Sequence, residues 1–191
     1  MNISQEDARE SLSKIQGVMV QTHRAIASAY ANPLLILWGV LWITAFTAAH
    51  FYADYDFHIF MAMCAAGGVG TLVICRVFRS KVPIQDTSSR IGRRVALLWI
   101  LLYVYVVIWL FLLAPFNGLQ CNAVISTAAM FAFVVIGLWF DSYFMVSLGL
   151  AVTAAILTGF CFLTDYYHLW MAVMGGGAML GTGLYIRFRW R

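Results

Sequence analysis

The sequence VALLWILLYVYVVIWLFLLA, residues 95–114, holds twenty residues and no charged side chain. A helix of that length covers about 30 Å, which is the thickness of the hydrocarbon core of a bilayer. Arg93 and Arg94 come directly before it, as is common where a transmembrane helix leaves the membrane on the cytoplasmic side. The segment therefore predicts a membrane-spanning helix.

Five more apolar segments of similar length stand on either side of it. They cover approximately residues 33–52, 57–77, 121–140, 143–163 and 167–186, and none has an Asp, Glu, Lys or Arg in its interior. Hydrophobic residues make up 63% of the 191-residue chain and charged residues 10%, whereas a soluble domain has about 45–50% and about 25%. This composition excludes an ordinary soluble enzyme and a disordered chain. We predict an all-α integral membrane protein with a six-helix transmembrane domain over residues 32–191.

Residues 1–31 are more polar and predict an amphipathic helix. Apolar side chains recur at helical spacing on one side of it, at Leu12, Ile15, Met19 and Ile26. We expect this helix to lie on the cytoplasmic membrane surface or to pair with another helix.

The basic residues decide the predicted orientation. If the N-terminus is cytoplasmic, six crossings put all twelve Lys and Arg on the cytoplasmic side, in keeping with the positive-inside rule. Both termini are then cytoplasmic, and the net charge of +4 reflects topology rather than nucleic-acid binding. The basic residues expected to meet lipid headgroups or a partner are Arg76, Arg79, Lys81, Arg90, Arg93 and Arg94.

An internal similarity links the second and sixth segments. The stretch FHIFMAMCAAG at residues 57–67 is similar to YHLWMAVMGGG at residues 167–177, with an offset of 110 residues. A duplication of spans one and two as spans five and six would give a parallel repeat. The alternative is that two apolar hairpins converged on similar sequences.

Small residues in these two segments predict close helix packing, because small side chains let helix backbones approach each other in lipid. We expect spans two and six to pack against each other or across an oligomer interface. The glycines at 175–177 are also compatible with a bend or an unwound turn near a ligand. The predicted packing residues are Ala62, Ala66, Gly70, Gly176, Gly177 and Gly181.

Three histidines and three aspartates fall at the predicted outer ends of the spans. They are His50, His58, His168, Asp54, Asp56 and Asp165. Imidazole and carboxylate together suit a transition metal such as Zn²⁺, so one hypothesis is an extracytoplasmic metal or haem site. The alternatives are an interfacial cap among Tyr and Trp side chains and a pH sensor. Nothing in the sequence requires a cofactor.

No catalytic motif points to an enzyme, and no span interior offers a nucleophile with a partner base. We therefore expect a non-enzymatic membrane protein: a regulatory, sensory or complex subunit that acts through helix packing, with the bilayer and a homo-oligomer or membrane-complex partner around it. The alternatives are a small transporter or channel for an uncharged solute, and a metal- or haem-binding protein.

Three stretches carry a family resemblance: NPLLILWG at 32–39, GLWF at 137–140, and the ending from LWMA at 169–172 to GTGLYIR at 181–187. They resemble a loose group of bacterial six-span inner-membrane proteins that has no known activity. The resemblance implies a bacterial cytoplasmic membrane, and it brings no catalytic residues.

Overall fold

The computed structural model describes Arg9, Gly17 and residues 32–79, 86–115 and 117–189. All regular structure within these ranges is helical, and six of the helical spans are long and apolar enough to cross a membrane. The chain is therefore all-α and compatible with a multi-pass membrane protein. The predicted amphipathic helix over residues 1–31 lies outside the described residues, apart from Arg9 and Gly17, which are helical.

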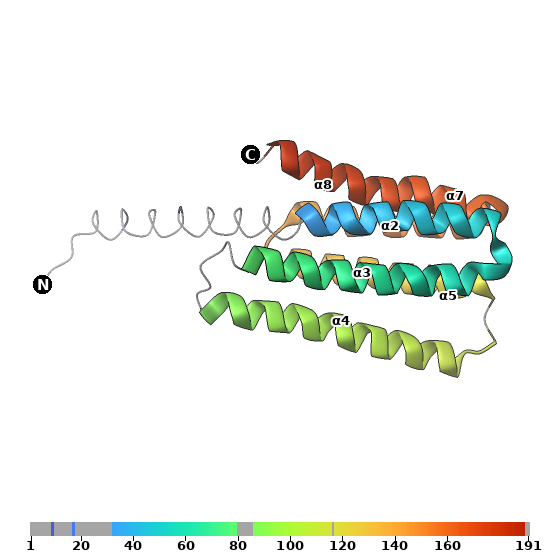
Figure 1. Ribbon diagram of the computed structural model, residues 1–191, viewed down its shortest axis with the longest axis horizontal. Coiled ribbons are helices and arrows are strands. Elements are labelled where there is room, and N and C mark those ends of the chain that lie inside the picture. The colour runs from blue at the N-terminus through green and yellow to red at the C-terminus, as the bar shows by residue number, and fades with distance from the viewer. Residues whose placement is uncertain (1–8, 10–16, 18–31, 80–85, 116, 190–191) are drawn as a thin grey trace, which may run out of the picture.

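The first five spans are single helices, and the sixth is interrupted (Figure 1). The five are α2 (Asn32–Phe51), α3 (Asp56–Arg79), α4 (Asp86–Leu112), α5 (Gly118–Trp139) and α6 (Tyr143–Phe162). The sixth consists of α7 (Tyr167–Met171), the π-helical segment η4 (Ala172–Gly176) and α8 (Gly177–Arg189). Two 3-10 turns, η2 (Ala53–Tyr55) and η3 (Thr164–Tyr166), precede α3 and α7.

The predicted spans agree with these helices to within a few residues, except at the start of α4. We expected residues 78–94 to be a connection, but the polar run from Asp86 is helical. An acidic residue at a helix start is a common sequence signal, and Asp86 is the first residue of this helix. Polarity in this stretch therefore marks the part of α4 that precedes the apolar span, which begins at Gly92.

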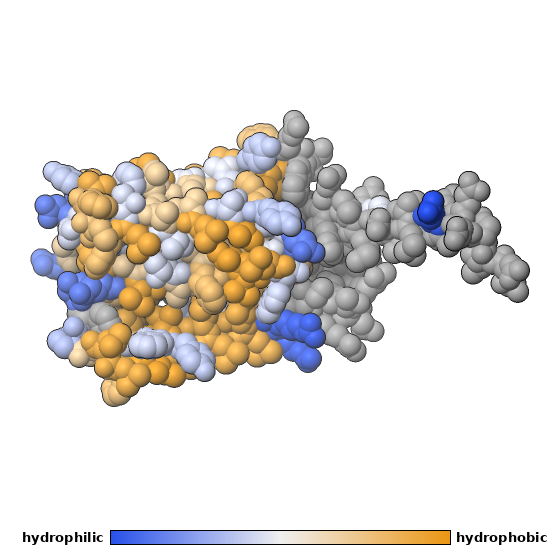
Figure 2. Space-filling model, turned by 180° about the vertical axis from the view of Figure 1, so that it is seen from behind, coloured by the Kyte–Doolittle hydropathy of each residue, from blue (hydrophilic) through white to orange (hydrophobic). Residues whose placement is uncertain are grey.

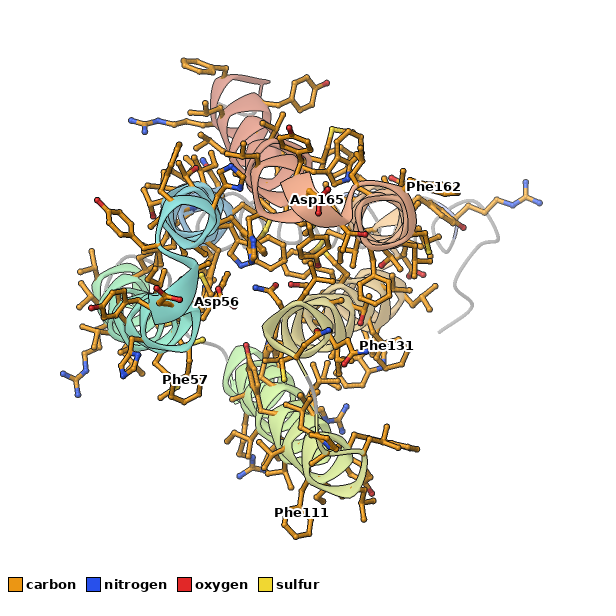
Figure 3. All side chains as sticks on the ribbon, turned by 90° about the vertical axis from the view of Figure 1, so that its right-hand side faces the viewer. Asp56, Phe57, Phe111, Phe131, Phe162 and Asp165 are labelled. Carbon is orange, nitrogen blue, oxygen red and sulfur yellow. The ribbon has the colours of Figure 1, made fainter. Side chains whose placement is uncertain are left out.

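The helices pack as a series in the order α3, α2, α7–α8, α6, α5, α4. α3 packs mainly on α2, and α4 packs mainly on α5, so these two helices are the ends of the series (Figures 1 and 3). The core lies between the central members and includes the fully buried Phe46, Met130, Ile156, Tyr167 and Met171.

Glycines on both partners bring α2 and α8 into close contact. A Cβ atom added to Gly39 would lie 2.6 Å from the backbone nitrogen of Leu180, and one added to Gly183 would lie 3.0 Å from that of Ile36. Because backbone atoms form these contacts, no side-chain rotation could make room. The pairing of α2 with α8 therefore depends on glycine at these positions.

The six predicted packing residues are used unevenly within the chain. Gly176 is buried against Ile43 of α2, and Gly70 is half-buried against Leu37. The other four do not pack closely: Ala62, Ala66 and Gly181 are exposed, and Gly177 has nothing within 4 Å of an added Cβ.

Within the described ranges, spans two and six pack mainly on a shared partner rather than on each other, since α3 and α8 both contact α2. On α3, the buried Gly67 packs against α2, since an added Cβ would lie 2.4 Å from the Trp38 ring. The Trp38 indole nitrogen also donates a hydrogen bond to Thr71 Oγ1 at 3.2 Å. The face of α3 that packs on α2 therefore includes Gly67 and Thr71, one residue after the predicted Ala66 and Gly70.

The turns that begin the second and sixth spans have the same form. The residue before η2, Tyr52, has φ −127° and ψ 57°, and the residue before η3, Leu163, has φ −129° and ψ 41°. Each 3-10 turn then reads small residue, Asp, Tyr, at an offset of 111 residues, which is one more than the offset of the similar stretches in the helices. The two hairpins, α2–α3 and α6–α7, thus have turns of the same conformation between their helices.

The glycine-rich stretch of the sixth span is π-helical rather than unwound. η4 buries Gly175 against the ring of Trp42, and Gly176 against Ile43. The wider π turn stays hydrogen-bonded, which the hydrocarbon region requires. Such segments are frequent at functional sites, and this one begins at Ala172, one helical turn after His168.

Candidate functional site

The structure brings one aspartate and one histidine together at the end of the bundle where α3 and α7 begin. Asp56 is the first residue of α3, and His168 is the second residue of α7. His168 Nε2 lies 3.7 Å from Asp56 Oδ1, and the side chains are only 17% and 19% exposed. Figure 3, which looks along the helices from this end, shows Asp56 on the inner side of α3. We call these two residues the Asp56–His168 pair.

The two facing atoms have no other partner. Asp56 Oδ1 and His168 Nε2 are both buried and make no hydrogen bond. A buried carboxylate without a donor is costly, and a nearby positive charge offsets that cost. No Lys or Arg occurs between residues 95 and 186 or between residues 25 and 75, so His168 is the nearest source of such a charge. When it is protonated, the pair is an ion pair that joins α3 to α7.

Two other helices enclose the pair. A Cβ added to Gly118, the first residue of α5, would lie 2.8 Å from Asp56 Oδ2, so the carboxylate packs directly against the start of this helix. Phe46 of α2 places its ring 6.2 Å from the His168 ring. His50 of α2 is close enough to interact electrostatically with His168, as Cys121 of α5 is with Asp56.

A second polar contact lies one to two turns further along α5. Asn122 and Ser126 are 7% and 4% exposed, and the Ser126 hydroxyl donates to Asn122 Oδ1 at 3.2 Å. The sequence analysis did not predict a role for Asn122. An amide four residues before a serine, in an otherwise apolar segment, was the available signal.

Of the other predicted metal or haem ligands, His50 lies near His168, and the remaining three are exposed. The His50 ring stacks on Tyr166 with centroids 6.3 Å apart. His58 makes edge contacts with Tyr55 and Phe57. Asp54 and Asp165 are exposed on their 3-10 turns. Rings next to histidines at a helix end are the arrangement expected of an interfacial cap.

Within the described ranges, no three His, Cys, Asp or Glu side chains are grouped so that they could hold a metal ion. The metal or haem hypothesis stays a prediction, and Asp56 and His168 are the two proposed ligands that do meet.

The opposite end of the bundle carries exposed arginines. Arg76 at the end of α3 and Arg93 and Arg94 near the start of α4 are all exposed. Figure 2 shows hydrophilic residues gathered at both ends of a face that is largely apolar between them. The side chains of Arg79 and Arg90, and Lys81 as a whole, lie outside what the structure describes.

No family model, curated protein or solved structure matches this chain. The resemblance to bacterial six-span inner-membrane proteins therefore stays a prediction, and functional inference rests on the geometry above.

Proposed function

We infer that the protein is a non-enzymatic, multi-pass subunit of a bacterial cytoplasmic membrane, with both termini cytoplasmic, and that it acts by associating with other membrane helices. The observation that carries this proposal is the poor internal packing of α3, which α4 shares. Only 6% of the residues in the most apolar stretch of each are buried, against 28–39% in the other four spans.

The side chains on the exposed part of α3 favour a protein partner over lipid alone. Ala62 and Ala66 are one helical turn apart and both exposed. Small residues at this spacing allow a second helix to approach closely, and that contact is a main source of helix association in lipid. We define Ala62 and Ala66 as the α3 association face. Its proposed occupant is a helix of a second copy or of another membrane subunit.

A regulatory or sensory role is supported by the Asp56–His168 pair. It links α3, which carries the association face, to α7 in the other hairpin. The shared turns before α3 and α7 favour a duplicated hairpin, and an even number of crossings between the copies would make the repeat parallel. A charge change at the pair would act on the contact between the two hairpins, and through it on the association face.

Cysteine crosslinking in membranes tests the association face. With the four native cysteines replaced by serine or alanine, Ala66→Cys is expected to give a disulfide-linked or crosslinker-linked oligomer. Ala151→Cys on α6, which replaces an equally small and exposed residue outside the association face, is the matched control and is expected to stay monomeric. A second variant, Ala66→Leu in the native background, is expected to shift natively purified protein toward the monomer. A free monomer in both crosslinking and native purification would remove the proposal.

The transporter hypothesis and the metal or haem hypothesis stay predictions. Solute uptake into proteoliposomes would support the first, and elemental analysis with an absorption spectrum would support the second.

A further inference from the structure

A second exposed surface lies where α3 faces α4. Figures 1 and 3 show α3 and α4 side by side, and the Cys64 thiol and the Tyr103 phenol are close enough to interact electrostatically. Gly68 and Cys75 follow Cys64 by four and eleven residues, so they share its face of the helix. Figure 3 shows Phe57, eleven residues before Gly68, on the side of α3 nearest α4.

Among the residues that the structure describes, none fills this surface at Gly68. Nothing lies within 4 Å of a Cβ added to Gly68. On α4, Ile100 and Val107 stand three residues before and four residues after Tyr103, and they are 58% and 63% exposed. We call the strip formed by Cys64, Gly68 and Cys75 of α3 with Ile100 and Tyr103 of α4 the α3–α4 seam.

The arginines lie at one end of the seam. Consecutive spans run antiparallel, so if Cys64 is level with Tyr103, then Arg76 is level with residue 91. Arg93 and Arg94 are two and three residues further along α4, which is about 3–5 Å at 1.5 Å per residue. No carboxylate among the described side chains pairs with any of the three arginines.

The length of the seam matches one leaflet of a bilayer. Twelve residues separate Cys64 from Arg76, which is about 18 Å of helix, and half of the hydrocarbon core is about 15 Å. We propose that the α3–α4 seam binds an anionic phospholipid, with its phosphate on Arg76, Arg93 and Arg94 and an acyl chain along Gly68 as far as Cys64 and Tyr103. Guanidinium groups bind phosphate through paired, charge-assisted hydrogen bonds, and basic sites between spans suit anionic headgroups. This site goes beyond the proposed function and lies on a different side of α3 from the association face.

Native mass spectrometry of the purified full chain, titrated with phosphatidylglycerol or phosphatidylcholine, tests both halves of the site. The wild-type protein is expected to retain phosphatidylglycerol in preference to phosphatidylcholine. The triple variant Arg76→Gln/Arg93→Gln/Arg94→Gln is expected to bind phosphatidylglycerol roughly tenfold or more weakly. Gly68→Leu fills the seam with a side chain that the fold has room for, and it is expected to weaken binding of the same lipid with its arginines intact.

Matched controls separate this site from general attraction to a basic protein. Arg187→Gln removes an exposed arginine on α8, and Gly181→Leu adds a side chain where nothing lies within 4 Å. Both are expected to bind phosphatidylglycerol as the wild type does. Equal retention of the two lipids by the wild type would overturn the proposal, as would unchanged binding by Gly68→Leu or an equal loss in the Arg187→Gln control.

Discussion

Replacing Gly39 by leucine is expected to prevent α2 and α8 from pairing and to remove most of the folded protein. The first added carbon would lie 2.6 Å from the Leu180 backbone nitrogen and 2.9 Å from its Cα. Relief requires the two helix axes to separate. Overpacking in a core usually lowers the free energy of unfolding by about 1–3 kcal/mol. Here the separation would also loosen the contacts of Trp42 and Phe46, which are buried side chains of α2.

The measurement is the yield of monodisperse protein in detergent together with its thermal unfolding temperature. Gly181→Leu is the control, since it puts the same side chain into open space on α8 and is expected to unfold within a few degrees of the wild type. A Gly39→Leu protein with wild-type yield and unfolding temperature would show that α2 and α8 are not held as close as this structure places them.

The spans could be predicted from the sequence because their length and lack of charge are direct requirements of the bilayer. The inward face of each span could not. In a soluble helix, polar residues mark the side that faces water, but lipid and protein core are equally apolar. Nothing in the sequence therefore distinguishes Ala66, which is exposed, from its neighbour Gly67, which packs on Trp38.

Only part of the candidate site could be predicted, because the sequence does not show which polar residues are buried. The sequence placed three acids and three histidines at one end of the bundle, but it could not say which of them would be buried. That choice is made by the 3-10 turn η2, which leaves Asp54 exposed and brings Asp56, two residues later, to the inner side of α3. In the second turn, the corresponding step brings Tyr167 inside and leaves Asp165 exposed. Asn122 was missed because it is a single uncharged polar residue within an otherwise apolar segment.

Removing either member of the Asp56–His168 pair is expected to destabilise the protein, and removing both is expected to cost less than the sum. Asp56→Asn or His168→Gln leaves the other group buried with no partner, and such a group typically costs about 1–3 kcal/mol. In the double variant neither ionisable group remains, so part of this cost disappears. The expected coupling energy lies in the range of about 0.5–3 kcal/mol that is found for residues in contact. The free energy of unfolding of the four proteins, measured in mixed detergent micelles, gives the coupling directly.

A parallel cycle with Asp165→Asn and His58→Gln tests whether the coupling belongs to the contact rather than to any acid and histidine at this end of the bundle. Both of these residues are exposed, so each single change is expected to leave the free energy of unfolding nearly unchanged. The effects of the two changes are expected to add. Additive costs in the Asp56–His168 cycle would mean that the 3.7 Å contact contributes nothing to stability, and the pair could not then transmit a charge change between hairpins. Coupling in the first cycle and additivity in the second would instead place an energetic link between α3 and α7.

The next measurement would be Ala66→Cys crosslinking in the Asp56→Asn background. If the pair controls the α3 association face, the yield of crosslinked oligomer should change, whereas an unchanged yield would limit the pair to a structural role.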